Sequence, residues 1–260
     1  MTREEAGYAI RGSESKISRL ELGRVSFKKR DITDLLRLYD IPEGDERVDA
    51  LVQLAEEANQ PGWWHRYDDV MAKWFQTYIG LEEAASLIRT YEIQFVPGLL
   101  QTEDYARAVV SVGAPQDTDE QIEAKVRVRL ERQRILERPE PPALWAVIDE
   151  AALRRPMGGR RLMRAQIEHL LLMMKRPNIT VQVVPFRQGG HAAESGAFTI
   201  LRFDGEDLPD VVYLEQLVSA LYLDKREQVD RYLQTMVRLT GEAPTPDATV
   251  ELLQKILEQT

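Results

Sequence analysis

Cysteine is absent from this sequence of 260 residues, and histidine occurs only three times. The lack of cysteine excludes disulfide bridges, thiolate zinc sites and a cysteine nucleophile. No apolar run approaches the roughly 18 residues that a membrane helix needs, and the acidic start of the chain does not resemble a secretory signal. We therefore expect a cytoplasmic protein that does not span a membrane.

The residues that usually carry catalysis are also scarce. The histidines, which lack metal-ligand spacing, are His65, His169 and His191. His191, Glu194 and Ser195 form the most enzyme-like cluster, but no nucleophile-elbow pattern surrounds Ser195. Gly189-Gly190 lacks the spacing of a phosphate-binding loop. We expect no catalytic residue, no metal and no cofactor, and hence a protein that is not an enzyme.

Charge is distributed unevenly along the chain. The net charge is -9, yet residues 11–30 hold seven cations and two anions, a local balance of +5. The rest of the chain is therefore near -14. This asymmetry favours a DNA-binding segment at the N-terminal end of an acidic protein; the alternative is ordinary solvated surface, which is the more frequent origin of a short basic stretch.

The first forty residues read as short helices. Thr2 and Glu5 have the spacing of a capping box, and Ser13 offers a second N-cap. Apolar residues at helical spacing predict a third helix over 30–39. Residues 1–42 are thus predicted to form a small helical module.

Beyond this module, residues 43–80 read as a helical connector and residues 81–260 as a larger domain. The connector holds an aromatic cluster, which we interpret as packing: Trp63, Trp64, Tyr67, Trp74, Phe75 and Tyr78. Helices are predicted over 81–90, 102–112, 117–136, 160–175, 225–240 and 247–258, and strands over 143–148, 179–186, 197–203, 211–214 and 220–223. The expected fold is mainly α with a C-terminal α/β (α+β) part.

Arginines and glutamates alternate along the predicted helix at 117–136. The arginines are Arg127, Arg129, Arg132 and Arg134. Alternating charge of this kind indicates an exposed helix laced with salt bridges.

The segment Arg11–Arg24 resembles the recognition helix of the large phage-repressor-like (XRE-type) helix-turn-helix class. In that class, the second helix places its N-terminal residues against base edges of double-stranded DNA. The resemblance implies base contacts from Glu14, Ser15, Ser18 and Arg19. It implies phosphate contacts from Arg24, Lys28 and Lys29. Lys16 lies between these sets and suits either role.

The same class usually has a further helix before the position of Thr2. That helix covers the core that here is formed by Ala6, Ile10, Ile17 and Leu35. We therefore expect a helix-turn-helix that is incomplete at its start, with an uncovered apolar face and weakened DNA binding.

Segments of the larger domain resemble a family abundant in streptomycetes and other actinobacteria, which joins this helix-turn-helix to an antitoxin-like C-terminal domain. The segments that carry the resemblance are 81–85, 91–106, 181–186 and 196–201. Family membership implies a small, toxin-like partner protein encoded nearby, which the regulator binds and neutralises.

These observations favour a DNA-binding transcriptional regulator. Because one recognition helix reads few base pairs, we expect a homodimer whose helices lie about 34 Å apart, one turn of duplex. Two alternatives stay open. One is a protein-sequestering module whose head has lost DNA binding, and the other is a ligand-sensing module with a pocket lined partly by the aromatic cluster.

Overall fold

The computed structural model describes residues 1–21, 28–42, 44–58, 62–205 and 208–260. The chain forms two compact units, Met1–His65 and Arg66–Thr260, and each is described by itself. In the described part of the chain, no helix has the length and apolar character needed to cross a membrane.

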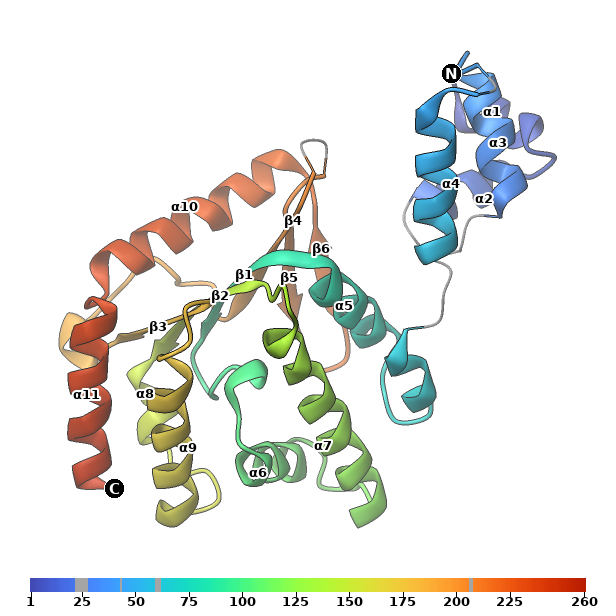
Figure 1. Ribbon diagram of the computed structural model, residues 1–260. Coiled ribbons are helices and arrows are strands. Elements are labelled where there is room, and N and C mark those ends of the chain that lie inside the picture. Colours follow the sequence, from blue (N-terminus) through green and yellow to red (C-terminus); the bar gives the residue numbers. More distant parts are fainter. Residues whose placement is uncertain (22–27, 43, 59–61, 206–207) are drawn as a thin grey trace. The chain divides into compact units, whose positions relative to one another are not determined.

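The first unit is helical (Figure 1). Its helices are α1 (Arg3–Ala9), α2 (Glu14–Glu21), α3 (Lys29–Leu38) and α4 (Glu46–Ala58), and the 3-10 turn η1 (Trp63–Tyr67) follows. The predicted capping box is confirmed, since Thr2 Oγ1 accepts from the Glu5 amide and the Glu5 carboxylate accepts from the Thr2 amide. Ser13 Oγ likewise accepts from the Lys16 amide at the start of α2.

Two apolar clusters hold the four helices together. Ala6, Ile10, Ile17 and Leu20 are each only 3–4% exposed, and Leu35 packs against them. On the other side of α3, Ile32 and Leu36 pack with Val52 of α4. The uncovered apolar face that the sequence predicted is therefore not observed, because contacts among α1, α2 and α3 bury these side chains.

A six-stranded mixed sheet organises the second unit, in the order β3-β2-β1-β4-β5-β6. The strands are β1 (Ala85–Glu92), β2 (Ala143–Asp149), β3 (Ile179–Val184), β4 (Phe198–Phe203), β5 (Val211–Glu215) and β6 (Ala220–Leu223). The first three are parallel to one another, whereas β4, β5 and β6 pair antiparallel from β1 outward. The central strand β1 thus has one parallel and one antiparallel neighbour.

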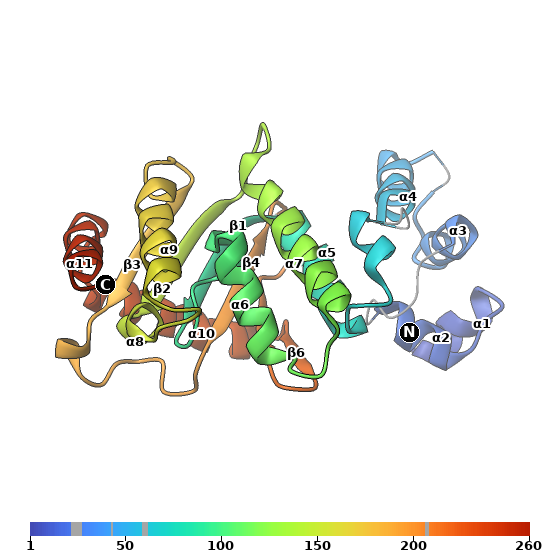
Figure 2. The ribbon, with the colours of Figure 1, turned by 90° about the horizontal axis from the view of Figure 1, so that it is seen from below.

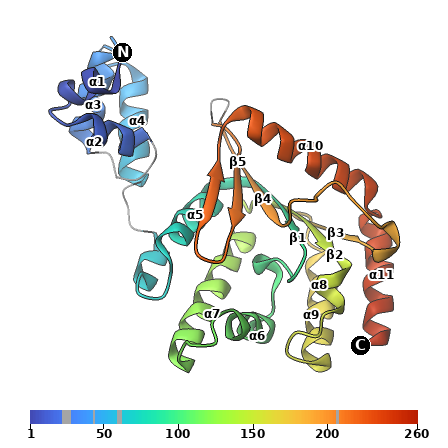
Figure 3. The same cartoon turned by 180° about the vertical axis from the view of Figure 1, so that it is seen from behind.

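Helices cover both faces of this sheet (Figure 1). They are α5 (Lys73–Ala84), α6 (Glu103–Gly113), α7 (Asp119–Gln133), α8 (Glu150–Arg154), α9 (Arg160–Met173), α10 (Arg226–Glu242) and α11 (Pro246–Gln259), with the short turns η2 (Gly98–Leu100), η3 (Arg134–Glu137) and η4 (Phe186–Gln188). Figure 2 shows α6, α7, α8 and α9 side by side on one face, and Figure 3 shows α10 crossing the other. Helix α11 packs on α9 and on β3 at the edge of the sheet.

Because both faces are covered, the central strands are apolar on both sides. Along β2, Ala146, Val147 and Ile148 are all fully buried, with Ala146 and Ile148 facing one core and Val147 the other. This arrangement confirms the predicted fold class. The helix predicted over 81–90 is wrong, because α5 ends at Ala84 and the next residues form β1.

Candidate nucleic-acid interface

The turn between α1 and α2 sets the geometry of the helix-turn-helix. Gly7 is buried in α1, and a Cβ built there would lie 2.8 Å from the Ser13 carbonyl carbon and 3.0 Å from the Glu14 amide nitrogen. Arg11, in the turn, adopts a left-handed backbone with φ of 53°. The close approach of backbone to Gly7 therefore fixes where α2 starts.

Gly7→Ala is expected to lower the free energy of unfolding of the first unit by about 1–3 kcal/mol, because the added methyl meets backbone rather than a movable side chain. Amide hydrogen exchange in residues 3–21 measures the change. Gly241→Ala is the control, since a Cβ at that position of α10 meets no atom within 4 Å. Unchanged exchange in the Gly7 variant would show that the turn can relax.

The predicted base-contacting residues lie on α2. Glu14 and Ser15, in its first turn, are exposed, and Ser18, one turn later, is partly buried. For Arg19 the structure describes the backbone but not the side chain, and Arg24 lies outside the described residues. Ile17 and Leu20 face the core. Glu14 and Ser15 are therefore exposed to solvent on α2, whereas its apolar residues face the core.

Lys16 has a partner inside the fold. Its Nζ lies 2.7 Å from Oδ2 of Asp31, whose side chain is only 7% exposed. The pair joins α2 to α3, so Lys16 helps to orient the recognition helix. Sequence reasoning missed Asp31, because its neighbours in sequence give no sign that this carboxylate is buried.

The predicted phosphate contacts lie beside α3. Lys28 is the N-cap residue of α3 and is exposed. Lys29 is also exposed, and its Nζ lies 3.5 Å from the Glu56 carboxylate of α4. Tyr8 of α1 is 88% exposed and adds an aromatic ring that sequence reasoning did not single out.

In the glycine-rich loop, His191 contacts residues at the ends of two strands. His191 Nε2 lies 3.0 Å from the Tyr91 hydroxyl and 3.8 Å from Oδ2 of Asp149. Its Nδ1 accepts from the Ala193 amide, which places the proton of the neutral ring on Nε2. The imidazole therefore anchors the loop before β4 to the ends of β1 and β2.

The aromatic cluster divides between two places. Trp63 and Trp64, in η1, meet edge to face with ring centres 5.9 Å apart. On α5, the Phe75 ring stacks on Tyr78, and the centre of the Tyr78 ring lies 4.1 Å from that of Tyr213 on β5. The interpretation as packing is confirmed for Tyr78, which lies in the core of the second unit, whereas Trp74 and Phe75 pack against this core and stay partly exposed.

Comparison with known proteins divides the sequence much as the two structural units do. A family described as a helix-turn-helix domain matches residues 1–51, and a family described as a domain of unknown function (DUF5753) matches residues 75–255. No curated protein and no solved structure matches the chain. The geometry of α1 and α2 is thus that of a helix-turn-helix domain, whereas the match to the larger unit names no activity.

Proposed function

Because this chain belongs to the DUF5753 family and carries a helix-turn-helix domain, we propose that it is a transcriptional regulator of the phage-repressor-like type found in actinobacteria. The observation that carries the proposal is the α1–turn–α2 unit, which lies within the matched helix-turn-helix region and exposes Glu14 and Ser15 on the first turn of α2. Residues at that place in the fold contact base edges.

The charge of the first unit supports the same role. The local balance of +5 over residues 11–30 contrasts with the acidic remainder of the chain. Cations beside a recognition helix bind phosphates and supply affinity without sequence preference. Within the proposal, Glu14, Ser15, Ser18 and Arg19 read bases, and Arg24, Lys28 and Lys29 bind phosphates.

The finer parts of the proposal rest on the resemblance and on DNA geometry. The regulator is a cytoplasmic homodimer, because paired recognition helices match one helical turn of duplex. Its larger unit is antitoxin-like and binds a small partner protein encoded nearby, and it performs no catalysis. A protein-sequestering module without DNA binding is the competing function. Selection of bound fragments from a random duplex pool by the full chain separates the two, because only the regulator enriches a sequence.

Arg19→Ala is expected to relax the preference for the selected sequence over an unrelated one by about 1–3 kcal/mol, since a bidentate arginine discriminates between bases. Lys28→Ala and Lys29→Ala are expected to weaken binding to both duplexes equally and to reduce the salt slope by about one ion each. Fluorescence anisotropy titrations at several salt concentrations measure both effects.

The control is Arg226→Ala, which removes a side chain that is 95% exposed in the second unit. This variant should bind like the parent protein. Equal and sequence-independent losses in the Arg19, Lys28 and Lys29 variants would contradict the assignment of Arg19 to base readout.

A further inference from the structure

The second unit contains a large cavity that is lined in part by α5 and α7. Its volume is about 870 Å³, and its walls come from α5, α7, the C-terminal half of α6, the segment after β1, and the adjoining ends of β4 and β5. Cavities of roughly 300–1,000 Å³ that combine apolar walls with a few polar groups are typical of small-molecule sites. The description of the matched domain names no ligand.

Aromatic side chains form one wall of the cavity. Trp74, Phe75 and Tyr78 come from α5, and Tyr213 comes from β5. Trp74 and Phe75 meet edge to face with ring centres 5.9 Å apart. Flat rings held in this way offer an apolar surface to a flat ligand.

A buried ion pair, Glu82 and Arg132, forms part of the cavity lining. Arg132 donates Nε and Nη2 to the two carboxylate oxygens of Glu82, each at 2.8 Å, and the Tyr78 hydroxyl donates to the same carboxylate. The guanidinium carbon also lies 5.0 Å from the centre of the Phe75 ring. These contacts commit Arg132 to the fold rather than to a ligand.

Arg129 stands one turn before Arg132 on α7 and also lines the cavity. Among the described residues, Arg129 Nη1 donates a hydrogen bond to Gln101 Oε1 at 3.0 Å. A guanidinium has five N–H donors in a planar fork that matches a carboxylate. Burial and the neighbouring positive charge of Arg132 lower the pKa of Arg129 to about 10, so an added negative charge would stabilise its charged form.

Two carboxyl groups complete the polar part of the lining, Glu92 at the end of β1 and Glu215 at the end of β5. The Tyr213 hydroxyl donates to Glu215 at 2.9 Å. Burial, followed by the charge of Glu215, raises the pKa of Glu92 to about 7, against the opposing influence of Arg129 and Arg132. At neutral pH a large share of Glu92 is therefore protonated and able to donate a hydrogen bond.

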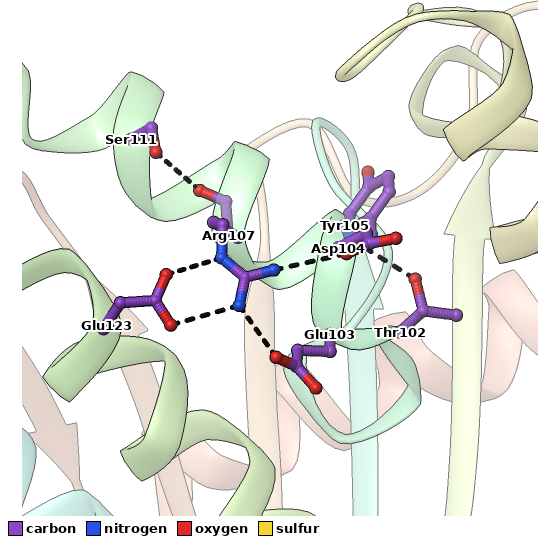
Figure 4. A network of polar contacts seen from close by, with 7 residues as sticks. All are labelled: Thr102, Glu103, Asp104, Tyr105, Arg107, Ser111 and Glu123. Carbon is purple, nitrogen blue, oxygen red and sulfur yellow. Dashed lines mark hydrogen bonds and ion pairs between the residues drawn. The ribbon is translucent and has the colours of Figure 1, made fainter. Parts of the chain in front are cut away.

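Two of the helices that line the cavity, α6 and α7, are also linked by charged side chains. Arg107 of α6 donates to Glu123 of α7 through Nε at 2.5 Å and Nη2 at 3.1 Å, and to Glu103 and Asp104 of its own helix (Figure 4). This network fixes α6 against α7. The position of Arg129 in the lining is thus set by packed helices rather than by a loop.

We propose that this cavity binds a small aromatic organic acid, with the ligand carboxylate on the Arg129 guanidinium and its flat ring system against Trp74 and Phe75. The inference goes beyond DNA binding and does not depend on it, because every residue involved lies in the second unit. An organic cation is the competing occupant, since Glu92 and Glu215 lie in the same lining.

Proton uptake should accompany binding of the acid. The charged and titratable groups that act on Glu92 are Glu215 of β5, Arg129 and Arg132 of α7, and Tyr105 of α6. A bound carboxylate adds negative charge beside these groups and favours protonated Glu92. Affinity for the acid should therefore fall as pH rises through about 7, and Glu92→Gln should flatten this dependence.

The test uses three probes with the same ring: 2-naphthoate, 2-naphthamide and 2-naphthylmethylamine, titrated calorimetrically into the full chain without DNA. We expect the naphthoate to bind at least tenfold more tightly than the amide, because a charge-assisted hydrogen bond contributes about 1.5–3 kcal/mol and each 1.4 kcal/mol is tenfold. Arg129→Met should remove this preference while leaving amide binding intact, which also shows that the variant folds. Arg129→Lys should restore part of it.

Arg127→Met is the matched control, since Arg127 lies on the same helix and is exposed. It should bind the naphthoate like the parent protein. Absence of saturable binding by any probe, tighter binding of the amine, or an equal loss in the Arg127 and Arg129 variants would overturn the proposal. None of these results bears on DNA binding by the first unit.

Discussion

Arg132→Met is expected to lower the free energy of unfolding of the second unit by about 3–5 kcal/mol, because it leaves the buried Glu82 carboxylate without its countercharge. The side chains of Arg132 and Glu82 are 8% and 2% exposed, and the pair is bidentate. Removing the cation also removes the ring contact with Phe75. Urea denaturation followed by far-ultraviolet circular dichroism measures the shift in midpoint.

Arg127→Met supplies the control, because it makes the same change at an exposed position of α7. Its effect should stay within about 0.5 kcal/mol. The double variant Glu82→Met, Arg132→Met should recover much of the loss, since two apolar side chains of similar volume replace a buried pair. A single Arg132 variant as stable as the parent protein would mean that water reaches Glu82.

The free energy of unfolding of the second unit is expected to decrease as pH rises from about 4.5 to about 7, owing to Glu92. Its pKa is higher in the folded protein than in the unfolded chain, so the folded state binds more protons in this range. The stabilising effect is complete below pH 4.5 and is lost as pH passes through 7. Since one pKa unit corresponds to about 1.4 kcal/mol, Glu92→Gln should be more stable than the parent protein by about 2–3 kcal/mol at pH 8.

Unfolding curves at pH 5, 6, 7 and 8 measure the difference between the two proteins. Glu227→Gln is the control, since that side chain is 86% exposed and should leave the pH dependence unchanged. Parallel pH profiles for the parent protein and the Glu92 variant would contradict the burial of this carboxyl group as the cause.

The helices of the first unit were predictable because their signals are local. A capping residue such as Thr2 acts within three positions of itself, and the apolar spacing of α2 and α3 is complete within each helix. The core positions of Ala6 and Ile17 were predicted, but the covering of their apolar face by contacts among three helices was not, because it depends on how those helices meet. The close approach of the Ser13 and Glu14 backbone to Gly7 likewise depends on two elements, and a single glycine within a helix does not predict it.

The error at β1 has a related cause. Residues 85–92 do not alternate strictly between apolar and polar side chains, and so short a segment does not distinguish a helix from a strand by its pattern alone. What makes them a strand is pairing with β2 and β4, which lie far along the chain. Strands with strong β-branched content, such as β3, were predicted correctly because their composition alone favours extended structure.

The interpretation of 117–136 as an exposed helix was wrong for its inner face. Arg132 is buried and Arg129 is partly buried, although their sequence neighbours are charged. Glu82, the partner of Arg132, lies 50 positions earlier on another helix. Charge pairs of this kind become visible only once α5 and α7 are placed against each other, and the cavity beside them was equally hidden.

The strand order β3-β2-β1-β4-β5-β6 has a consequence for synthesis. Among the six strands, β1 is the first to leave the ribosome, yet one of its two neighbours in the sheet, β4, begins only at Phe198. Until then the nascent parallel strands offer an open edge along β1, to which another chain can add. The interval ends when Phe198–Phe203 emerges and closes that edge, so the yield of native protein should depend on translation speed between the two strands.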